Sequence, residues 1–274
     1  MAQAWAQLGL ALRGEQFLIG YEMYNEPWVG DLYARPWLLL PSVADRFNIQ
    51  PLYDRLAAQL RQADPQHVVF FESITFDNFV PVGFSEVPGG PDHRARSALS
   101  YHYYEPPDFW ADSFWAVRAL DTQRLQCGAL LSEFAIYEGA ATMEKIMDLC
   151  DAHLHSWASW EVHSLLDSAL TPNYDTLKHV SRTYAQAVAG HALSQSFNST
   201  SGLYRLQLEV DPSLPAPTEI YLNEALHYSS GFEVEVEPAS AVAWKRARRN
   251  RIEVTPLQGC AQGQRVTLTI SRKS

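Results

Sequence analysis

The sequence predicts an α/β domain of repeated strand-helix units, followed by a small antiparallel β-sandwich. Up to about residue 190, short apolar runs alternate with longer helical patterns, which is typical of strands and helices around a parallel sheet. After that residue, short segments alternate apolar and polar positions with turns between them, which is typical of half-buried antiparallel strands. The predicted domains are therefore residues 1–190 and 191–274.

The composition is that of a globular protein that avoids polyanions. The chain has 274 residues, of which 47% are hydrophobic and 19% charged, so each domain can bury a core of its own. Its formal net charge of -10 repels phosphate backbones over most of the surface, which argues against a nucleic-acid partner. Three cysteines are too few for a disulfide scaffold, and no stretch of about 18 apolar residues would span a membrane.

Each element of the first domain follows from its own pattern. The opening residues mix Trp5 and leucines with small and polar residues, which predicts an amphipathic helix and no signal peptide. Leu52, Leu56 and Leu60 lie at helical spacing in a predicted helix over residues 43–63. The predicted strands are 17–25, 67–73, 98–104, 128–134 and 156–162, and the further helices are 111–125, 140–153 and 171–190.

The second domain contains five alternating segments and one basic run. The segments predict strands at 204–210, 218–222, 232–238, 250–254 and 265–270. The basic run KRARRNR, residues 245–251, could serve nuclear import or contact anionic lipid, but its place between Trp244 and a strand favours a solvated hairpin. A headgroup contact there would suit an enzyme that acts at a lipid surface.

Two glutamates are the main catalytic candidates because both end predicted strands. Glu26 follows the first strand, and Pro27 favours an extended conformation of the residue before it. Glu133 ends the strand 128–134. In barrels of strand-helix units the catalytic groups lie at the C-terminal ends of strands. One carboxylic acid and one carboxylate are what glycosidic cleavage needs, although a single Glu at a strand end is more often structural.

Four further residues suit a sugar site beside these glutamates. Asn25 can hydrogen-bond a sugar hydroxyl, while His102 and Tyr104 share one face of a strand and can reach the two carboxylates. Trp160, at the end of the fifth predicted strand, can stack against a sugar ring. A lone His or Trp is more often a core residue, whereas the whole set of residues in this order favours a sugar site.

Taken in order, these residues carry a resemblance to a known family. The motifs Asn25-Glu26-Pro27, His102-x-Tyr104, Glu133-Phe134 and Trp160 resemble the retaining β-glycosidases of glycoside hydrolase family 5, whose catalytic domain is a (β/α)8 TIM barrel. The longer segment GYEMYNEPWVGD, with YHYY, LLSEF and the final sandwich, is most similar to the endoglycoceramidase branch of that family. Enzymes of this branch release the intact glycan from ceramide in glycosphingolipids.

The resemblance implies a role for each residue and requires neither a metal nor a cofactor. Glu26 would be the general acid/base and Glu133 the nucleophile, with their carboxyl groups about 5 to 5.5 Å apart. The other implied roles are hydrogen bonding of the sugar 2-hydroxyl by Asn25, tuning of the pair by His102, orientation of the nucleophile by Tyr104 and a platform for the sugar at Trp160.

Aromatic residues near these positions favour a cleft that accepts lipid. Trp28 and Val29 follow the acid/base candidate, and the sequence PPDFWADSFW lies within residues 105–116. The resemblance also implies that the five predicted strands are barrel strands 4 to 8, and that strands 1 to 3 have no counterpart in this sequence. The prediction is therefore a partial TIM barrel followed by the sandwich.

Three functions remain open from the sequence. The first is hydrolysis of the bond between glycan and ceramide by a double displacement, the second is another family 5 β-glucosidase or endoglucanase, and the third is a truncated, non-catalytic glycolipid-binding protein. The expected partner is a glycosphingolipid substrate, with a membrane-surface contact through the sandwich and no nucleic acid. The resemblance implies secretion or a lysosome-like endomembrane compartment, and it leaves glycan preference and oligomeric state open.

Overall fold

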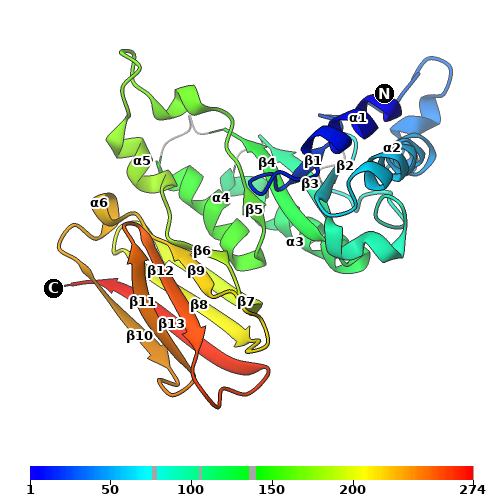
Figure 1. The fold of residues 1–274 in the computed structure, drawn as a ribbon. Coiled ribbons are helices and arrows are strands. Elements are labelled where there is room, and N and C mark those ends of the chain that lie inside the picture. Colours follow the sequence, from blue (N-terminus) through cyan, green and yellow to red (C-terminus); the bar gives the residue numbers. More distant parts are fainter. Residues whose placement is uncertain (76–78, 105–106, 136–139, 274) are drawn as a thin grey trace. The chain divides into compact units, whose positions relative to one another are not determined.

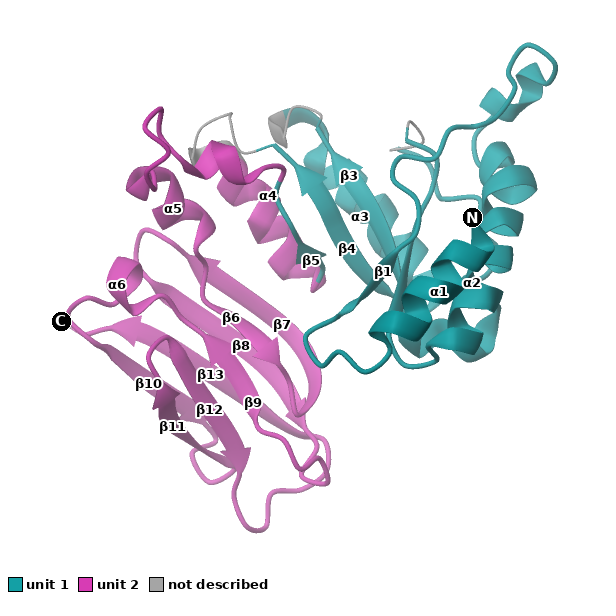
Figure 2. Cartoon of the chain, turned by 45° about the horizontal axis from the view of Figure 1, so that its top comes forward, with its two compact units in different colours: residues 1–135, 155–159 teal, residues 136–154, 160–274 magenta. Residues whose placement is uncertain are grey.

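The computed structural model describes residues 1–75, 79–104, 107–135 and 140–273 (Figure 1). The chain divides into two compact units (Figure 2). The first unit comprises Met1–Ala135 and His155–Ser159, and the second comprises Ile136–Leu154 and Trp160–Ser274. Among the described residues, none of the helices combines the length and the apolar character that crossing a bilayer requires.

A parallel five-stranded sheet forms the centre of the first unit, which confirms the predicted partial barrel. The strands lie in the order β1-β2-β3-β4-β5, and each pairs in parallel with the next. Because all five run in the same direction, the residues that follow them collect at one edge of the sheet. The strands are β1 (Gly20–Glu22), β2 (Val68–Glu72), β3 (Ser97–Tyr103), β4 (Gly128–Phe134) and β5 (Ser156–Trp157).

The helices of this unit form largely where their patterns predict them. The predicted helix over residues 43–63 is a π-helical turn η2 (Asp45–Ile49) that runs into α2 (Gln50–Ala63). Pro51 lies at the start of α2, directly after the junction where the helix changes from π to α geometry. Leu56 and Leu60 are buried in the core. The other helical segments are α1 (Ala2–Leu12), α3 (Pro107–Leu125) and the 3-10 turns η1 (Pro36–Leu39) and η3 (Pro91–Arg96).

The first and fifth strands are shorter than predicted. The apolar run at 17–25 yields only the three residues of β1, and the run at 156–162 yields only the two residues of β5. Both are edge strands of the described sheet, so hydrogen bonds from a neighbouring strand stabilise each of them along one side only. Glu26 therefore lies in the loop, four residues after the end of β1, rather than directly after a strand.

Aromatic packing against α3 fixes β3, the central strand of the sheet. Every residue of β3 is buried. The rings of Tyr101 and Phe114 lie 5.4 Å apart, and those of Tyr103 and Trp115 lie 5.0 Å apart. Since side chains alternate along a strand, the residue between the two tyrosines points to the opposite face of the sheet. That residue is His102.

The second unit contains the predicted sandwich, built from two antiparallel four-stranded sheets. One sheet has the order β10-β13-β8-β7 and the other the order β11-β12-β9-β6. Alternate residues of the strands, such as Leu206, Leu208 and Ile220, are buried between them. The strands are β6 (Tyr184–Ala187), β7 (Gly190–Asn198), β8 (Leu203–Val210), β9 (Thr218–Tyr221), β10 (Phe232–Glu237), β11 (Val242–Arg248), β12 (Arg251–Pro256) and β13 (Gln264–Arg272).

The predicted helix over residues 171–190 is wrong in its second half. Besides α4 (Ala140–His153), the 3-10 turn η4 (Val162–Leu165) and the short α6 (Glu224–His227), this unit contains α5, which spans only Tyr174–Val180. The alanine-rich segment after it favours a helix locally, yet it forms β6 and pairs with β9. The sandwich therefore begins before residue 190, because cross-strand pairing outweighs the local preference.

The basic run at residues 245–251 forms the solvated hairpin that its position predicted. It spans the end of β11 and the start of β12, which pair in antiparallel fashion. Three of its cations are matched by carboxylates of the same unit, in the pairs Lys245–Glu253, Arg246–Glu224 and Arg251–Glu219. The hairpin is therefore much less cationic than its sequence.

Candidate active site

The register of β3 and β4 brings the predicted nucleophile beside the predicted histidine. His102 and Glu133 are partners in the ladder between the two strands. The Nδ1 atom of His102 lies 3.6 Å from Oε2 of Glu133. His102 is only 7% exposed, so the imidazole is held within the sheet edge and does not swing freely.

An irregularity in β4 produces this pairing. Leu131 pairs with the residue before His102, whereas Glu133 pairs with His102 itself, which leaves Ser132 outside the ladder. In an unbroken ladder Glu133 would share the face of Leu131, which packs away from the site. Burial agrees with the shift, because the fully buried residues Leu131 and Phe134 lie three positions apart. The extra residue turns Glu133 toward His102.

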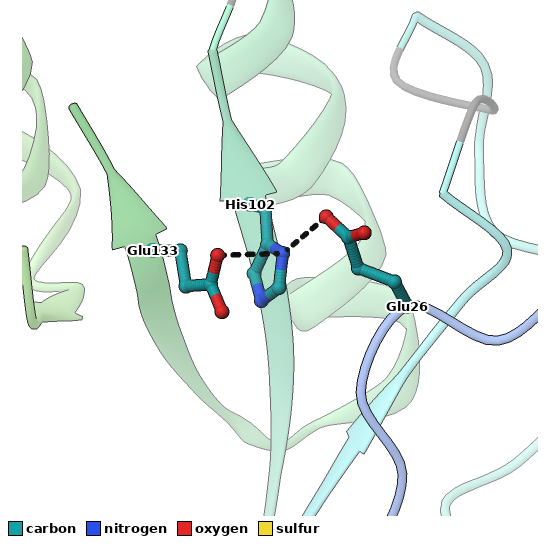
Figure 3. A group of neighbouring side chains, drawn as sticks. All are labelled: Glu26, His102 and Glu133. Carbon is teal, nitrogen blue, oxygen red and sulfur yellow. Dashed lines mark hydrogen bonds and ion pairs between the residues drawn. The ribbon is translucent and has the colours of Figure 1, made fainter. Parts of the chain in front are cut away.

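Glu26 reaches the same place from the loop after β1. Its Oε1 atom and Nδ1 of His102 share a hydrogen bond of 2.9 Å, so the imidazole lies between the two glutamates (Figure 3). One carboxylate oxygen of Glu26 and one of Glu133 lie within 4.8 Å of each other. This close approach is compatible with the carboxyl separation of about 5 to 5.5 Å in retaining glycosidases.

Tyr104 fixes the orientation of the second carboxylate. Its hydroxyl donates a hydrogen bond of 2.7 Å to Oε2 of Glu133. The Glu133 side chain retains 19% of its exposure and the Glu26 side chain 39%, so both carboxylates can meet a substrate. The structure thus brings together four of the predicted residues: Glu26, His102, Tyr104 and Glu133.

A third glutamate, Glu72, belongs to this cluster and was missed from the sequence. It is the last residue of β2 and is 3% exposed. The backbone N–H of Glu26 donates a hydrogen bond of 2.7 Å to its Oε2, and its Oε1 lies 3.7 Å from Nδ1 of His102. Its position at the end of an apolar strand, like that of Glu133, was the signal that could have found it.

Burial makes the Glu72 carboxyl a weaker acid than an exposed one. Desolvation raises its pKa to about 8, and the hydrogen bond from the Glu26 N–H only partly opposes this rise. Negative charge on Glu22, Glu26 and Glu133 adds to it. Near neutral pH, the Glu72 carboxyl is therefore largely protonated and uncharged.

The raised pKa of Glu72 predicts a measurable pH dependence of stability. The folded state retains a proton that the unfolded chain releases above its ordinary pKa of 4.5, so stability falls as pH rises from 4.5 to about 8. Glu72→Gln removes this loss. Relative to wild type, its free energy of unfolding should increase from pH 5 to pH 8, by up to a few kcal/mol. Urea unfolding at both pH values measures the change.

The exposed Glu15→Gln provides the matched control for this experiment. Its stability relative to wild type should be the same at pH 5 and pH 8. A constant difference between Glu72→Gln and wild type across that range would contradict the assignment of an uncharged Glu72.

A pocket of about 240 Å³ opens beside Glu26. Glu72, His102 and Tyr104 line one part of it, and the other lining residues include Ser73, Thr75 and Phe79. The pocket combines hydroxyl groups with an aromatic ring on the side of the predicted acid/base. It offers room for part of a leaving group.

Three further predicted site residues are exposed at the surface of the described chain. Asn25 precedes Glu26 and is exposed, and the Trp28 side chain is 58% exposed. Trp160 is 57% exposed, lies three residues after β5 and belongs to the second unit. Their proposed sugar and lipid contacts stay predictions.

The aromatic segment predicted to face lipid divides between surface and core. Residues 105–106 lie outside the described part of the chain. Phe109 is 83% exposed, whereas Phe114 and Trp115 are fully buried against β3. Only the first part of this segment can contribute to a cleft that accepts lipid.

Family models match both parts of the chain. Residues 1–165 match the model described as cellulase, glycosyl hydrolase family 5. Residues 182–270 match the model described as the glycoside hydrolase family 5 C-terminal domain. The second match begins two residues before β6.

Two curated relatives are similar over most of this chain. One is an endoglycoceramidase of Cyanea nozakii, 37% identical over 99% of this chain and 58% of its own length. The other is an endoglycoceramidase of Hydra vulgaris, 40% identical over 86% of this chain and 48% of its own length. The chain thus spans about half the length of these relatives.

Solved structures share the fold at low identity. Endo-glycoceramidase II from Rhodococcus sp., in a complex with a five-membered iminocyclitol, has a TM-score of 0.80 and 21% identity, over 100% of this chain and 64% of its own. Sterylglucosidase 1 of Cryptococcus neoformans has a TM-score of 0.60 and 14% identity, over 82% of this chain and 43% of its own. At these identities the likeness concerns the fold alone.

Proposed function

Because this chain belongs to glycoside hydrolase family 5, we propose that it hydrolyses the β-glycosidic bond between glycan and ceramide in glycosphingolipids, with retention of configuration. The observation that carries the proposal is the close pair of Glu26 and Glu133, with oxygens within 4.8 Å. The curated relatives named endoglycoceramidase support the substrate class. In the Rhodococcus sp. enzyme, one structure is titled a lactosyl-enzyme intermediate and another a ganglioside GM3 complex.

In the first displacement, the carboxylate of Glu133 attacks the anomeric carbon. A bond forms between its oxygen and that carbon while the bond to the ceramide oxygen breaks. The electron pair goes to the ceramide oxygen, which takes the proton of Glu26. The products are ceramide and a glycosyl ester on Glu133, and Glu26 is left as a carboxylate.

In the second displacement, water replaces the enzyme on the anomeric carbon. Glu26 takes a proton from the attacking water, and the bond to Glu133 breaks with its electron pair returning to the Glu133 oxygen. Two inversions give net retention. Glu26 regains its proton, so the cycle closes without any further reactant.

The neighbours of the pair support this division of roles. Tyr104 donates to one oxygen of Glu133, which leaves the other oxygen to attack. The Nδ1 atom of His102 lies within 4 Å of both carboxyl groups, so it can contact whichever of Glu133 and Glu26 is negatively charged during the reaction. The pocket beside Glu26 lies where a leaving group protonated by Glu26 would emerge.

A comparison of substrates tests the proposal. The protein is incubated separately with ganglioside GM3, with an alkyl β-glucoside and with a soluble β-glucan, and the products are separated by mass. We expect intact oligosaccharide and ceramide from the ganglioside, and much slower release from the other two substrates. The first-formed sugar should be the β-anomer by NMR.

Other outcomes would replace this proposal. Preference for the alkyl glucoside or the glucan would assign the chain to another activity of the same family. Ganglioside binding without release of ceramide from any substrate would assign it to a non-catalytic glycolipid-binding protein. An initial α-anomer would refute the retaining mechanism.

A membrane-surface contact through the sandwich is the finer part of the proposal. Its support is the cationic hairpin of β11 and β12, with Trp244 39% exposed on the same strand. Three of the hairpin cations are already paired with glutamates, so the electrostatic attraction to anionic lipid should be small.

A further inference from the structure

We propose that Glu72 is a positioning residue for the acid/base, and that its buried side chain holds the backbone of Glu26 in place. The inference rests on the proposed function, since it concerns the group that protonates the leaving oxygen. Glu72 itself makes no bond to the reacting atoms in the two displacements. It acts through the main chain of Glu26.

The backbone of Glu26 needs such support. Its φ of +44° lies in the left-handed region, which costs a residue with a Cβ about 1 kcal/mol or more. The N–H of this strained residue donates to Glu72 Oε2 at 2.7 Å, and Glu72 is anchored at the end of β2. The short bond to a buried, fixed acceptor therefore opposes relaxation of the loop.

A second contact fixes the other end of the same short segment. The hydroxyl of Tyr53, on α2, donates to the backbone carbonyl of Tyr24 at 3.2 Å. The same hydroxyl accepts a hydrogen bond of 3.1 Å from the N–H of Glu72. The backbone is thus held on both sides of Asn25, at Tyr24 by the Tyr53 hydroxyl and at Glu26 by the Glu72 carboxyl. These two groups are linked because the Tyr53 hydroxyl also accepts from the Glu72 N–H. This network sets the direction of the Glu26 side chain.

The charges around Glu72 explain why an uncharged acid suits this place. Glu22 on β1, Glu26 in the loop and Glu133 on β4 all add negative charge. His102 on β3 is the nearby titratable base, and Oε1 of Glu72 lies 3.7 Å from its Nδ1.

Two further charged groups lie beyond this ring of carboxylates. Asp45 of η2 accepts hydrogen bonds from the backbone of Ile74 and Gly83, and Arg118 of α3 lines the same pocket beside Asp121. The described hydrogen bonds of Glu72 are two: its Oε2 accepts from the Glu26 N–H, and its N–H donates to the Tyr53 hydroxyl. Neither bond pairs the Glu72 carboxyl with a positive charge.

The proposed reaction moves negative charge toward Glu72. The first displacement neutralises Glu133 and leaves Glu26 as a carboxylate, directly beside the Glu72 side chain. A negative charge on Glu72 would oppose that transfer, whereas an uncharged acid would not. Ionisation of Glu72 should therefore slow the first displacement at alkaline pH.

The test compares Glu72→Gln and Glu72→Ala on two leaving groups. Gln can accept the same hydrogen bond from the Glu26 N–H and stays uncharged at every pH, while Ala removes the acceptor. kcat and KM are measured from pH 5 to 9.5 with the best natural substrate and with an aryl glycoside whose phenol departs without a proton. Glu15→Gln is the matched control, and thermal unfolding verifies that each variant is folded.

We expect Glu72→Gln to keep kcat within about threefold at pH 6 and to shift the alkaline fall in kcat/KM to higher pH. Glu72→Ala should lose about 30-fold in kcat/KM on the natural substrate through kcat, with KM little changed. On the aryl glycoside its loss should be at least fivefold smaller, because only the proton-requiring leaving group depends on a well-placed Glu26.

Three results would overturn the inference on an active protein. The first is an equal loss of kcat/KM by Glu72→Ala on both leaving groups. The second is a kcat of Glu72→Gln as low as that of Glu72→Ala. The third is a fall of kcat/KM at alkaline pH that is the same in Glu72→Gln and wild type. Wild-type protein inactive on every substrate would instead refute the proposed function, and the inference with it.

Discussion

Glu133→Gln is expected to lower the rate of glycolipid hydrolysis by about 10,000-fold or more while leaving the protein folded and able to bind substrate. The amide has the shape of the carboxylate but carries no negative charge, so it cannot form the glycosyl ester. Tyr104 can still donate its hydrogen bond to the amide oxygen, which preserves the local structure. Ceramide release is measured by mass, and binding by calorimetry with the same ganglioside.

The matched control is Glu15→Gln, which replaces an exposed glutamate of the same unit and should keep full activity. Hydrolysis by Glu133→Gln within tenfold of wild type would refute the assignment of Glu133 as the nucleophile. If Glu133→Gln does not hydrolyse the substrate and also does not fold, the assignment of the nucleophile is tested with a second variant, Glu133→Asp. This variant keeps the charge but shortens its reach, and it should keep the fold while remaining at least about 100-fold slower than wild type.

Glu26→Gln should separate substrates by the leaving group. With ceramide, whose alkoxide is a poor leaving group, we expect kcat/KM to fall by about 1,000-fold because the departing oxygen receives no proton. With an aryl glycoside whose phenol is acidic, kcat/KM should fall by less than about tenfold. The second displacement still lacks its base in this variant, so the glycosyl ester should accumulate and be visible as an added mass on the intact protein.

Azide provides the control for the second step. As an anion that attacks without losing a proton, it needs no general base, and it should restore turnover of the aryl glycoside by Glu26→Gln with a β-glycosyl azide as product. Equal losses on both leaving groups, or no response to azide, would mean that Glu26 is not the acid/base.

The sequence predicted the parts of the fold that depend on local pattern. The strand 128–134 and the helix 140–153 have the predicted bounds, because a compact apolar run and a long amphipathic stretch each leave little choice. The helix over residues 171–190 was wrong beyond Val180, because only pairing with β9 in the folded chain makes a strand of the alanine-rich segment.

The same distinction holds for the site. Glu26, His102, Tyr104 and Glu133 could be predicted to converge because strand ends of a parallel sheet meet at one edge. Glu72 also ends an apolar strand, in HVVFFES, so its position could have marked it as a candidate. Its support of Glu26 could not be predicted, because its burial and its hydrogen bond to another loop are not visible in those letters.

The irregularity at Ser132 has a consequence for how this site can be gained or lost. The face on which Glu133 lies is decided by one residue that takes no part in the ladder. If Ser132 were instead paired with His102 in an unbroken ladder, Glu133 would lie beside Tyr103 in the helix-facing layer and Glu26 would lack its partner. Deletion of Ser132 would also give an unbroken ladder, but one in which Glu133 still pairs with His102, so the two carboxylates would stay together. The site therefore tolerates loss of this residue, but not loss of the irregularity with the residue retained, and a search for sequence motifs would not detect that second change.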